Sequence, residues 1–178
     1  DEFMVPDTSD DVKRVLENYE DFGGLCVNWK IFGSDGHLER PEGLQIGAFV
    51  RCMPNQHPWN QYVKTIARPS LIAKAQNAHY FEYVEGATCV NARRDAVRGP
   101  YIPCDPNAPL RLNHYYTRSK QEFEEKVVLG GGGHLRANIN SLDDCAKNCV
   151  IEDRSILRFE SALKDALARR TQTACSPE

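Results

Sequence analysis

Two acidic residues, Asp1 and Glu2, come directly before the apolar residues Phe3, Met4 and Val5. Carboxylates at the end of a buried strand can hold a hard divalent cation, which takes oxygen ligands and often also contacts substrate phosphates. Charged chain ends are more commonly solvated at the surface. On these residues alone, a solvated segment is the favoured interpretation and a cation site is the alternative.

The loop FGSDGH places Gly33 and Gly36 beside three polar residues, Ser34, Asp35 and His37. Glycines allow the backbone to approach a ligand closely, and loops between strands often carry substrate contacts. The same residue types also form an ordinary β-turn. Composition alone leaves both interpretations open.

Four further side chains outside this loop could contact a ligand. Trp29 could stack on a sugar ring and donate through its N–H, or it could be a core residue. Lys64 and Arg68 lie on one side of an expected strand, where they could meet a diphosphate or simply be solvated. His114 lies between aromatic residues and is either a metal ligand or, more commonly, a structural hydrogen-bonding group.

The seven cysteines are an odd number and contain no CxxC pair. Cys145 and Cys149 would lie on one face of a helix, and a zinc site there would need two more ligands close by. Packing cysteines or scattered disulfides are therefore favoured over zinc.

Strands in the middle of the chain and helices towards its ends must position these residues. DTSDDVKRVLENYEDFGG has capping residues, helically spaced apolar residues and a Gly-Gly stop, which predicts a helix. In SKQEFEEKVVLGGGG, Ser119 and Glu122 form a capping box, which predicts a second helix. Residues with high β-propensity predict strands in LCVNWKIF, LQIGAFVRC, YVKTIARP, AHYFEYVEG and LRLNHYY.

The C-terminal segment has apolar residues at helical spacing, which predicts an amphipathic helix that packs on the rest of the chain. These residues are Ile156, Phe159, Leu163 and Leu167. Residues 171–178 are expected to form a frayed tail. Strands in the middle with helices at both ends indicate an α/β or α+β domain.

The composition is that of a soluble globular domain. The chain has 178 residues, 41% of them hydrophobic, and 22 basic against 25 acidic residues give a net charge of -3. A nucleic-acid partner bound by a basic surface is therefore not expected. No run approaches the roughly 18 consecutive apolar residues of a membrane span, and no signal peptide is evident.

In their order along the chain, five segments resemble the glycosyltransferases of family 92 and closely related family 2-like enzymes. The segments are DEF, VNWKIFGSDGHLERPEGL, KTIARP, AHYFEY and RLNHYYTRSKQEFEEK. The resemblance implies an α/β fold, a GT-A-like mixed sheet with flanking helices. It also implies that residues 1–130 are the C-terminal, acceptor-side part of a larger domain. Residues 131–170 would be a helical extension, and 171–178 the tail.

The resemblance also implies a metal site. In the family a strand ends in Asp-x-Asp-Glu-Phe, whose aspartates bind manganese and the diphosphate of a nucleotide sugar. Asp1 matches the second aspartate, and the first would precede this chain. His114 would complete the Mn²⁺ site, which suits an imidazole combined with carboxylates. Arg118 would face the diphosphate, which its fixed fork of donors suits.

The implied reaction moves a sugar from a nucleotide-diphosphate donor, such as a UDP-sugar, to a hydroxyl of a glycan or other acceptor. The metal would neutralise the leaving diphosphate, and a carboxylate would accept the acceptor's proton, with inversion at the sugar. The resemblance implies substrate contacts for Trp29, Ser34, His37 and Arg118. The full set of predicted substrate-contacting residues also includes Gly33, Gly36, Lys64, Arg68 and His79.

One departure from the family pattern concerns the general base. Relatives usually carry a glutamate where this chain has Gly47. Asp35, Glu39 and Glu42 are the candidate replacements, and spacing does not choose among them. A transferase-like module that binds a glycan or a protein without catalysis is therefore the alternative function. A nucleotidyl- or phosphotransferase is less favoured, because no phosphate-cradling glycine loop is present.

Family 92 enzymes are typically anchored in membranes of the secretory pathway, so the resemblance implies a Golgi location for the full-length protein. The membrane segment would lie outside this chain. No Asn-x-Ser/Thr sequon supports a lumenal location.

Overall fold

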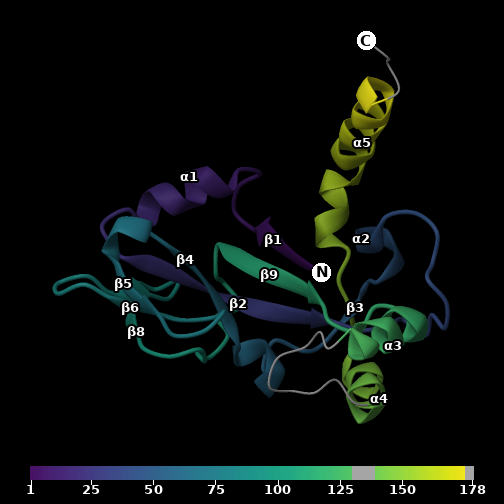
Figure 1. Cartoon of the computed structure of the whole chain (residues 1–178), viewed down its shortest axis with the longest axis horizontal. Helices are drawn as coiled ribbons and strands as arrows, with labels where there is room; N and C mark the ends of the chain where they lie inside the picture. The colour runs from purple at the N-terminus through teal and green to yellow at the C-terminus, as the bar shows by residue number, and fades with distance from the viewer. Residues whose placement is uncertain (130–138, 175–178) are drawn as a thin grey trace.

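Strand β2 (Gly24–Phe32) is the centre of a mixed eight-stranded sheet (Figure 1). The structure is a computed structural model and describes residues 1–129 and 139–174. The main path of the sheet runs β1 (Glu2–Pro6), β9 (Leu110–Tyr115), β2, β3 (Arg51–Cys52), β10 (Ile151–Glu152). Three further strands join it: β4 (Val63–Ala67), β7 (Cys89–Val90) and β8 (Ala96–Val97). The protein is thus a mixed α/β fold with flanking helices.

The pairing register brings the N-terminal residues next to His114. Strand β9 pairs in parallel with β2, with Ile31 opposite His114, and antiparallel with β1, with Glu2 opposite His114. Strand β4 pairs antiparallel with β2, with Lys64 opposite Val27. The strands expected at LCVNWKIF, YVKTIARP and LRLNHYY are confirmed, and β1 begins at Glu2 rather than ending there.

The remaining strands form a hairpin. β5 (Ile72–Ala75) pairs antiparallel with β6 (Phe81–Tyr83), which confirms the strand expected in AHYFEYVEG. Short 3-10 helices η2 (Pro58–Gln61) and η3 (Pro69–Leu71) precede β4 and β5. The hairpin lies at the end of the molecule opposite to α3 (Figure 1).

The two helices expected from capping signals are present. Helix α1 (Val12–Leu16) is capped by Asp11 and continues into the 3-10 helix η1 (Glu17–Tyr19). Its apolar face packs on β2 and β9 in a cluster that includes Val15, Leu25 and Leu112.

Helix α3 (Lys120–Val128) begins with the predicted capping box, formed by Ser119 and Glu122. The Ser119 hydroxyl donates to the Glu122 carboxylate at 2.8 Å and accepts from the Glu122 N–H at 3.3 Å. Both residues are buried, so the cap also fixes where α3 starts against the sheet.

The prediction of a strand in LQIGAFVRC is wrong for the first half of this segment. Residues Gln45–Ala48 form helix α2, and only Arg51–Cys52 form a strand. Ile46 and Phe49 are three residues apart and pack into one core cluster with Tyr115. A short apolar run is compatible with the periodicity of a helix and with that of a strand. Here the helical spacing decides which side chains reach the core.

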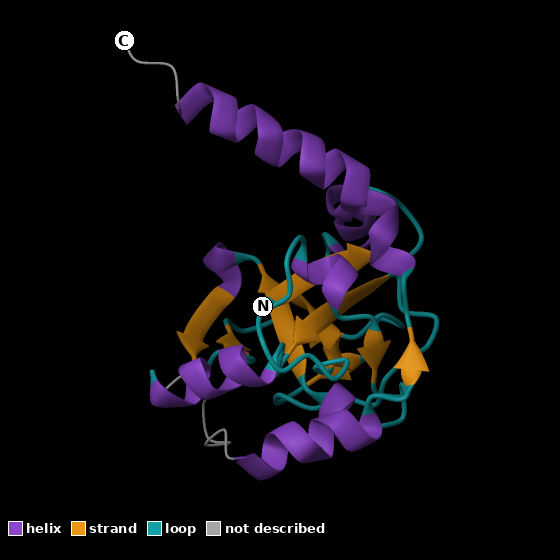
Figure 2. Cartoon of the chain, turned by 90° about the vertical axis from the view of Figure 1, so that its right-hand side faces the viewer, coloured by secondary structure: helices purple, strands orange, loops and turns teal. Residues whose placement is uncertain are grey.

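The C-terminal segment is divided rather than one helix. It forms α4 (Ile139–Asn148), β10, the 3-10 helix η4 (Ser155–Phe159) and α5 (Glu160–Ala174). Ile156, Phe159 and Leu163 pack on the core as expected, but Leu167 is 44% exposed, because α5 projects away from the sheet (Figures 1 and 2). The helix continues to Ala174, four residues into the expected tail. Gly130–Gly133 lie outside the described residues.

Within residues 1–129 and 139–174, no helix is both long and apolar enough to cross a membrane.

Asp153 ties the C-terminal segment to the sheet. Its carboxylate accepts hydrogen bonds from Lys30 and from the N–H of Ser155, and Arg111 lies 3.6 Å away. Burial alone would raise the pKa of Asp153, but the hydrogen bonds from Lys30 and Ser155 outweigh it and hold the pKa well below its ordinary value.

We expect Asp153→Asn to lower the free energy of unfolding by about 1–3 kcal/mol at pH 7, because it removes a charged acceptor from a half-buried network. The folded pKa lies below the unfolded one, so this stabilisation is present above about pH 4 and is lost as the pH falls further. Urea unfolding at pH 7 and pH 3 measures both effects. Asp10→Asn, at an exposed ion pair with Arg158, is the matched control. An equal loss at both pH values would contradict the assignment.

Candidate functional site

A pocket of about 570 Å³ lies where β1, β9 and β2 meet the loop that precedes β6. Its lining is mainly aromatic and charged. The lining residues are Asp1, Glu2, Trp29, Tyr62, Lys64, Asn77, Ala78, His79, Pro100, Tyr101, His114, Tyr116 and Lys126. We call this space the central pocket.

Two carboxylates and one imidazole meet on paired strands in the central pocket. The Nε2 atom of His114 lies 3.8 Å from Oδ1 of Asp1, and its Nδ1 atom lies 3.9 Å from Oε1 of Glu2. Both distances are too long for hydrogen bonds. The groups face one another because the β1 and β9 register sets Glu2 opposite His114.

His114 is a neutral imidazole at physiological pH. The residue is only 6% exposed, and burial, with the nearby Lys126 and Lys64 ammonium groups, lowers its pKa to about 3. Its Nδ1 atom is buried and has no hydrogen-bond partner among the described residues. A buried polar atom without a partner costs free energy, so this nitrogen is suited to accept a ligand.

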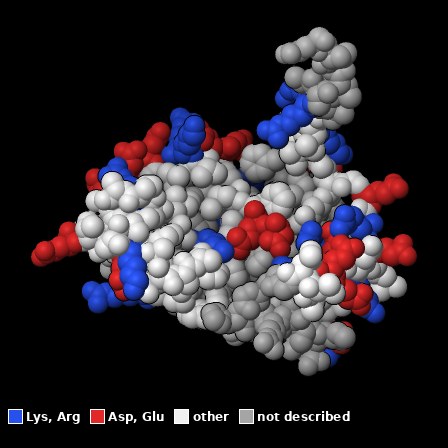
Figure 3. Space-filling view, in the orientation of Figure 1, with Lys and Arg blue, Asp and Glu red and all other residues white. Residues whose placement is uncertain are grey.

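Two lysines neutralise the carboxylates. Lys126, from α3, contacts Oδ2 of Asp1 at 2.8 Å, and Lys64, from β4, lies 3.6 Å from Glu2. Burial, and then the charge of Arg118, lower the pKa of Lys126. Acidic and basic side chains also lie side by side near the middle of the face seen in Figure 3, where Figure 1 places the N-terminus.

Trp29 forms the aromatic wall of the central pocket. Its ring stacks on Tyr62 with centroids 5.1 Å apart and meets the His114 and His79 rings edge-on at 4.5 and 5.2 Å. The indole Nε1 is buried and has no partner among the described residues. His79 is held by Val63, whose carbonyl oxygen lies 2.8 Å from its Nδ1. Tyr62 therefore covers one face of the indole, and the buried Nε1 is an unused donor.

The donor set fits part of a metal site. Asp1 and His114 offer a carboxylate and a neutral imidazole, which suit Mn²⁺. Among residues 1–129 and 139–174, no group of three or more His, Cys, Asp or Glu side chains could hold a metal ion. Asp1 and His114 would thus be two ligands of a set that other groups complete.

Five residues predicted from the sequence meet in the central pocket. These are Asp1, Trp29, Lys64, His79 and His114. The sequence did not point to Lys126, Tyr62 or Tyr101. Lys126 reaches Asp1 only because α3 packs beside β1, and Tyr62 and Tyr101 meet through hydroxyls 2.9 Å apart from distant segments. No local pattern signals either contact.

The FGSDGH loop does not line the central pocket, so the expected acceptor contacts of Gly33, Ser34, Gly36 and His37 are not brought there. His37 Nε2 lies 3.1 Å from the carbonyl oxygen of Ala48, and its ring meets Phe49 edge-on.

Gly33, Ser34 and Gly36 suit the tight packing and backbone conformation of this turn. Ser34 is buried, and a Cβ at Gly33 would come within 2.9 Å of Cys149. Gly36 has a φ of +81°, which favours glycine. These contacts fit the interpretation of the loop as a turn, and its acceptor contacts stay a prediction.

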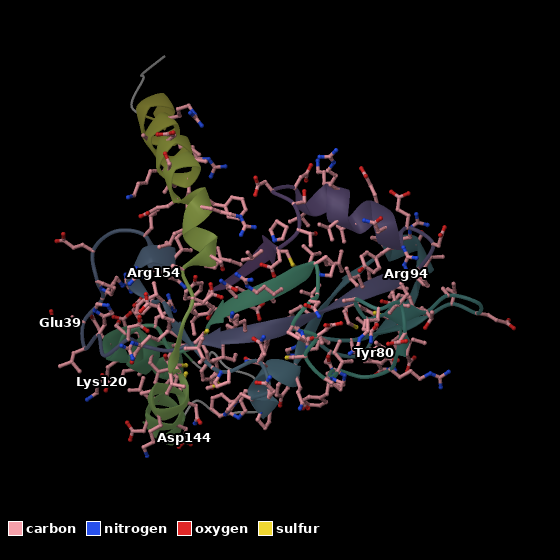
Figure 4. All side chains as sticks on the ribbon, turned by 180° about the vertical axis from the view of Figure 1, so that it is seen from behind. Glu39, Tyr80, Arg94, Lys120, Asp144 and Arg154 are labelled. Carbon is pink, nitrogen blue, oxygen red and sulfur yellow. The ribbon has the colours of Figure 1, made fainter. Side chains whose placement is uncertain are left out.

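The three candidate bases lie outside the central pocket. The Asp35 carboxylate accepts hydrogen bonds from the backbone N–H groups of Val50, at 2.8 Å, and Arg51, at 3.0 Å. Glu39 and Glu42 are exposed, and Figure 4 shows Glu39 on the opposite side of the molecule from Tyr80, the neighbour of His79. The carboxylates that line the central pocket are Asp1 and Glu2.

The two predicted arginines also lie outside the central pocket. Arg68 is exposed just after β4, and its N–H donates to the carbonyl of Gly23. Arg118 has a φ of +55°, and its guanidinium donates to Glu122 at 3.2 Å. Arg118 is thus engaged with the capping box of α3.

Cys145 and Cys149 share one face as predicted, with sulfur atoms 3.6 Å apart in the core.

Comparisons of the chain with known protein families, with curated proteins and with solved structures found no match.

Asp35→Ala should destabilise the fold by about 1–3 kcal/mol, because two backbone N–H groups lose their acceptor. Glu39→Ala, at an exposed position in the same segment, should change stability by less than about 0.5 kcal/mol and serves as the control. Urea unfolding measures both. If the two variants are equally stable, the structural role assigned to Asp35 is contradicted.

Proposed function

We propose that this chain belongs to a metal-dependent glycosyltransferase, which moves a sugar from a nucleotide-diphosphate donor, such as a UDP-sugar, to an acceptor hydroxyl. One observation carries the proposal. Asp1 and His114, the expected metal ligands, lie in the same pocket as Trp29, Lys64 and His79, which were expected to contact substrate. The resemblance to family 92 supports the same reaction. A GT-A fold, a membrane anchor elsewhere and a Golgi location belong to the proposal.

The residues of the central pocket have separable roles in this proposal. Asp1 and His114 hold Mn²⁺, which when bound neutralises the leaving diphosphate. Lys64 adds positive charge near the phosphates, since an ammonium group attracts them as a point charge. Trp29 stacks on the sugar or acceptor ring and donates through its Nε1.

Glu2 replaces the earlier candidates as general base. It lines the central pocket, whereas Asp35, Glu39 and Glu42 do not. A carboxylate that accepts the acceptor's proton must lie within hydrogen-bond reach of the hydroxyl. The remaining pocket carboxylate, Asp1, is assigned to the metal.

A glycan-binding module without catalysis is the second candidate. The ion pair between Lys126 and Asp1 favours it, because an ammonium at 2.8 Å already neutralises the carboxylate that a metal would need. Gly47, where relatives usually carry a glutamate, points the same way.

The full-length protein should release UDP from a UDP-sugar in the presence of Mn²⁺ and an acceptor glycan, and a chelator should abolish the release. Glu2→Gln should lower kcat at least about 100-fold, because general-base catalysis contributes that much. Glu82→Gln, on the hairpin strand β6, is the control. Activity that a chelator leaves unchanged would overturn metal dependence, and glycan binding without turnover would support the second candidate.

His114→Ala should weaken Mn²⁺ binding at least about 10-fold while the far-UV circular dichroism spectrum stays unchanged, because the imidazole has no structural hydrogen bond from Nδ1. Electron paramagnetic resonance of free Mn²⁺ measures the affinity. His57→Ala, at a histidine that caps η2 outside the central pocket, is the matched control. Unchanged Mn²⁺ affinity, or global unfolding, would indicate a structural histidine instead.

A further inference from the structure

Two buried cysteines on neighbouring strands lie in unusually close contact. The Sγ atoms of Cys26, on β2, and Cys89, on β7, are 3.0 Å apart. This is about 1 Å longer than the roughly 2.05 Å of a covalent S–S bond. Both residues are almost completely buried in a cluster with Val63, Val97 and Ile102.

The fold brings these cysteines together from distant parts of the chain. Strand β7 pairs in parallel with the start of β2, with Gly24 opposite Cys89 and Leu25 opposite Val90. Parallel neighbours require a long connection between them. That connection holds β4 and the β5–β6 hairpin, and it supplies Lys64 and His79 to the central pocket.

We propose that Cys26 and Cys89 form a disulfide bond that ties β7 to β2. The bond closes the segment from Cys26 to Cys89 and so restrains one wall of the central pocket. It would form during folding, before the cluster excludes solvent, and burial would then protect it from reductants. The proposal does not depend on the proposed transferase activity.

The oxidant is a small-molecule disulfide such as oxidised glutathione. The Cys26 thiolate attacks one glutathione sulfur, which forms a mixed disulfide and releases one glutathione thiolate. The Cys89 thiolate then attacks the Cys26 sulfur, forms the protein disulfide and releases the second glutathione thiolate. Two protein thiols are oxidised, one glutathione disulfide is reduced, and the two thiol protons pass to the released thiolates.

In the folded protein the same contact makes Cys26 the more readily ionised of the two thiols. Its hydrogen bond with Cys89 lowers the pKa of the Cys26 thiol, burial opposes this, and a second contact with the Thr65 hydroxyl lowers the pKa further. The thiolate is the reactive form of cysteine.

Three other cysteines of the described residues are less suited to pair. Cys145 and Cys149 are four residues apart, joined by a helical backbone hydrogen bond, and their sulfurs are 3.6 Å apart. Cys104 uses its thiol to contact the carbonyl of Asn60 at 3.0 Å. Cys145 and Cys149 therefore serve as the internal comparison.

The test refolds the chain from denaturant with a mixture of reduced and oxidised glutathione. After an acid quench, iodoacetamide in denaturant without reductant should leave two of the seven cysteines unmodified. Tryptic digestion should yield a linked pair of peptides, residues 15–30 and 75–93, which contain Cys26 and Cys89. Modification of all seven cysteines, or a link between any other pair, would overturn the proposal.

Thermal unfolding gives a second measurement. The Tm of protein refolded with oxidised glutathione should exceed that of protein refolded with a reductant by about 5–15 °C. The double variant Cys26→Ala with Cys89→Ala should lose this difference, and Cys145→Ala with Cys149→Ala should keep it. A difference that persists without Cys26 and Cys89 would overturn the proposal, and the peptide mapping decides the matter if that variant does not fold.

Discussion

The pairing of β9 with strands on both of its edges is the constraint on which the central pocket depends. Strand β1 pairs with one edge antiparallel, and β2 pairs with the other in parallel. The two registers set Glu2 and Ile31 on either side of His114, so the first residues of the chain meet a residue more than a hundred positions later. A shift of one residue would turn His114 to the opposite face of the sheet and dismantle the pocket.

The chemistry of the pocket combines one buried imidazole with partly exposed charges. Burial keeps His114 neutral, and the ion pairs of Lys126 with Asp1 and Lys64 with Glu2 lie beside it. Buried ionisable groups and unpartnered polar atoms destabilise a fold, so His114 and the unpartnered Nε1 of Trp29 make this pocket the candidate functional site.

The connection between β2 and β9 has two parts. One part supplies side chains that line the pocket, and the other holds the backbone near the core. The segment that carries β4 and the hairpin supplies Lys64 and His79 to the pocket. The FGSDGH loop instead uses Asp35 and His37 to hold the backbone around α2 and β3. A glycine-rich polar loop that binds a ligand and one that forms a structural turn have the same composition. Both need the same donors, acceptors and backbone freedom.

The elements that could be predicted from the sequence are those whose signals lie within a few neighbouring residues. The capping box of Ser119 and Glu122 predicted α3 correctly, and the β-rich runs predicted β2, β4 and β9. Five residues predicted from the sequence line the central pocket. Only the tertiary structure decided that LQIGAFVRC begins as a helix, that Asp35 is structural and that Lys126 neutralises Asp1. Each of these depends on contacts between distant segments, and periodicity and spacing along one chain contain no information about such contacts.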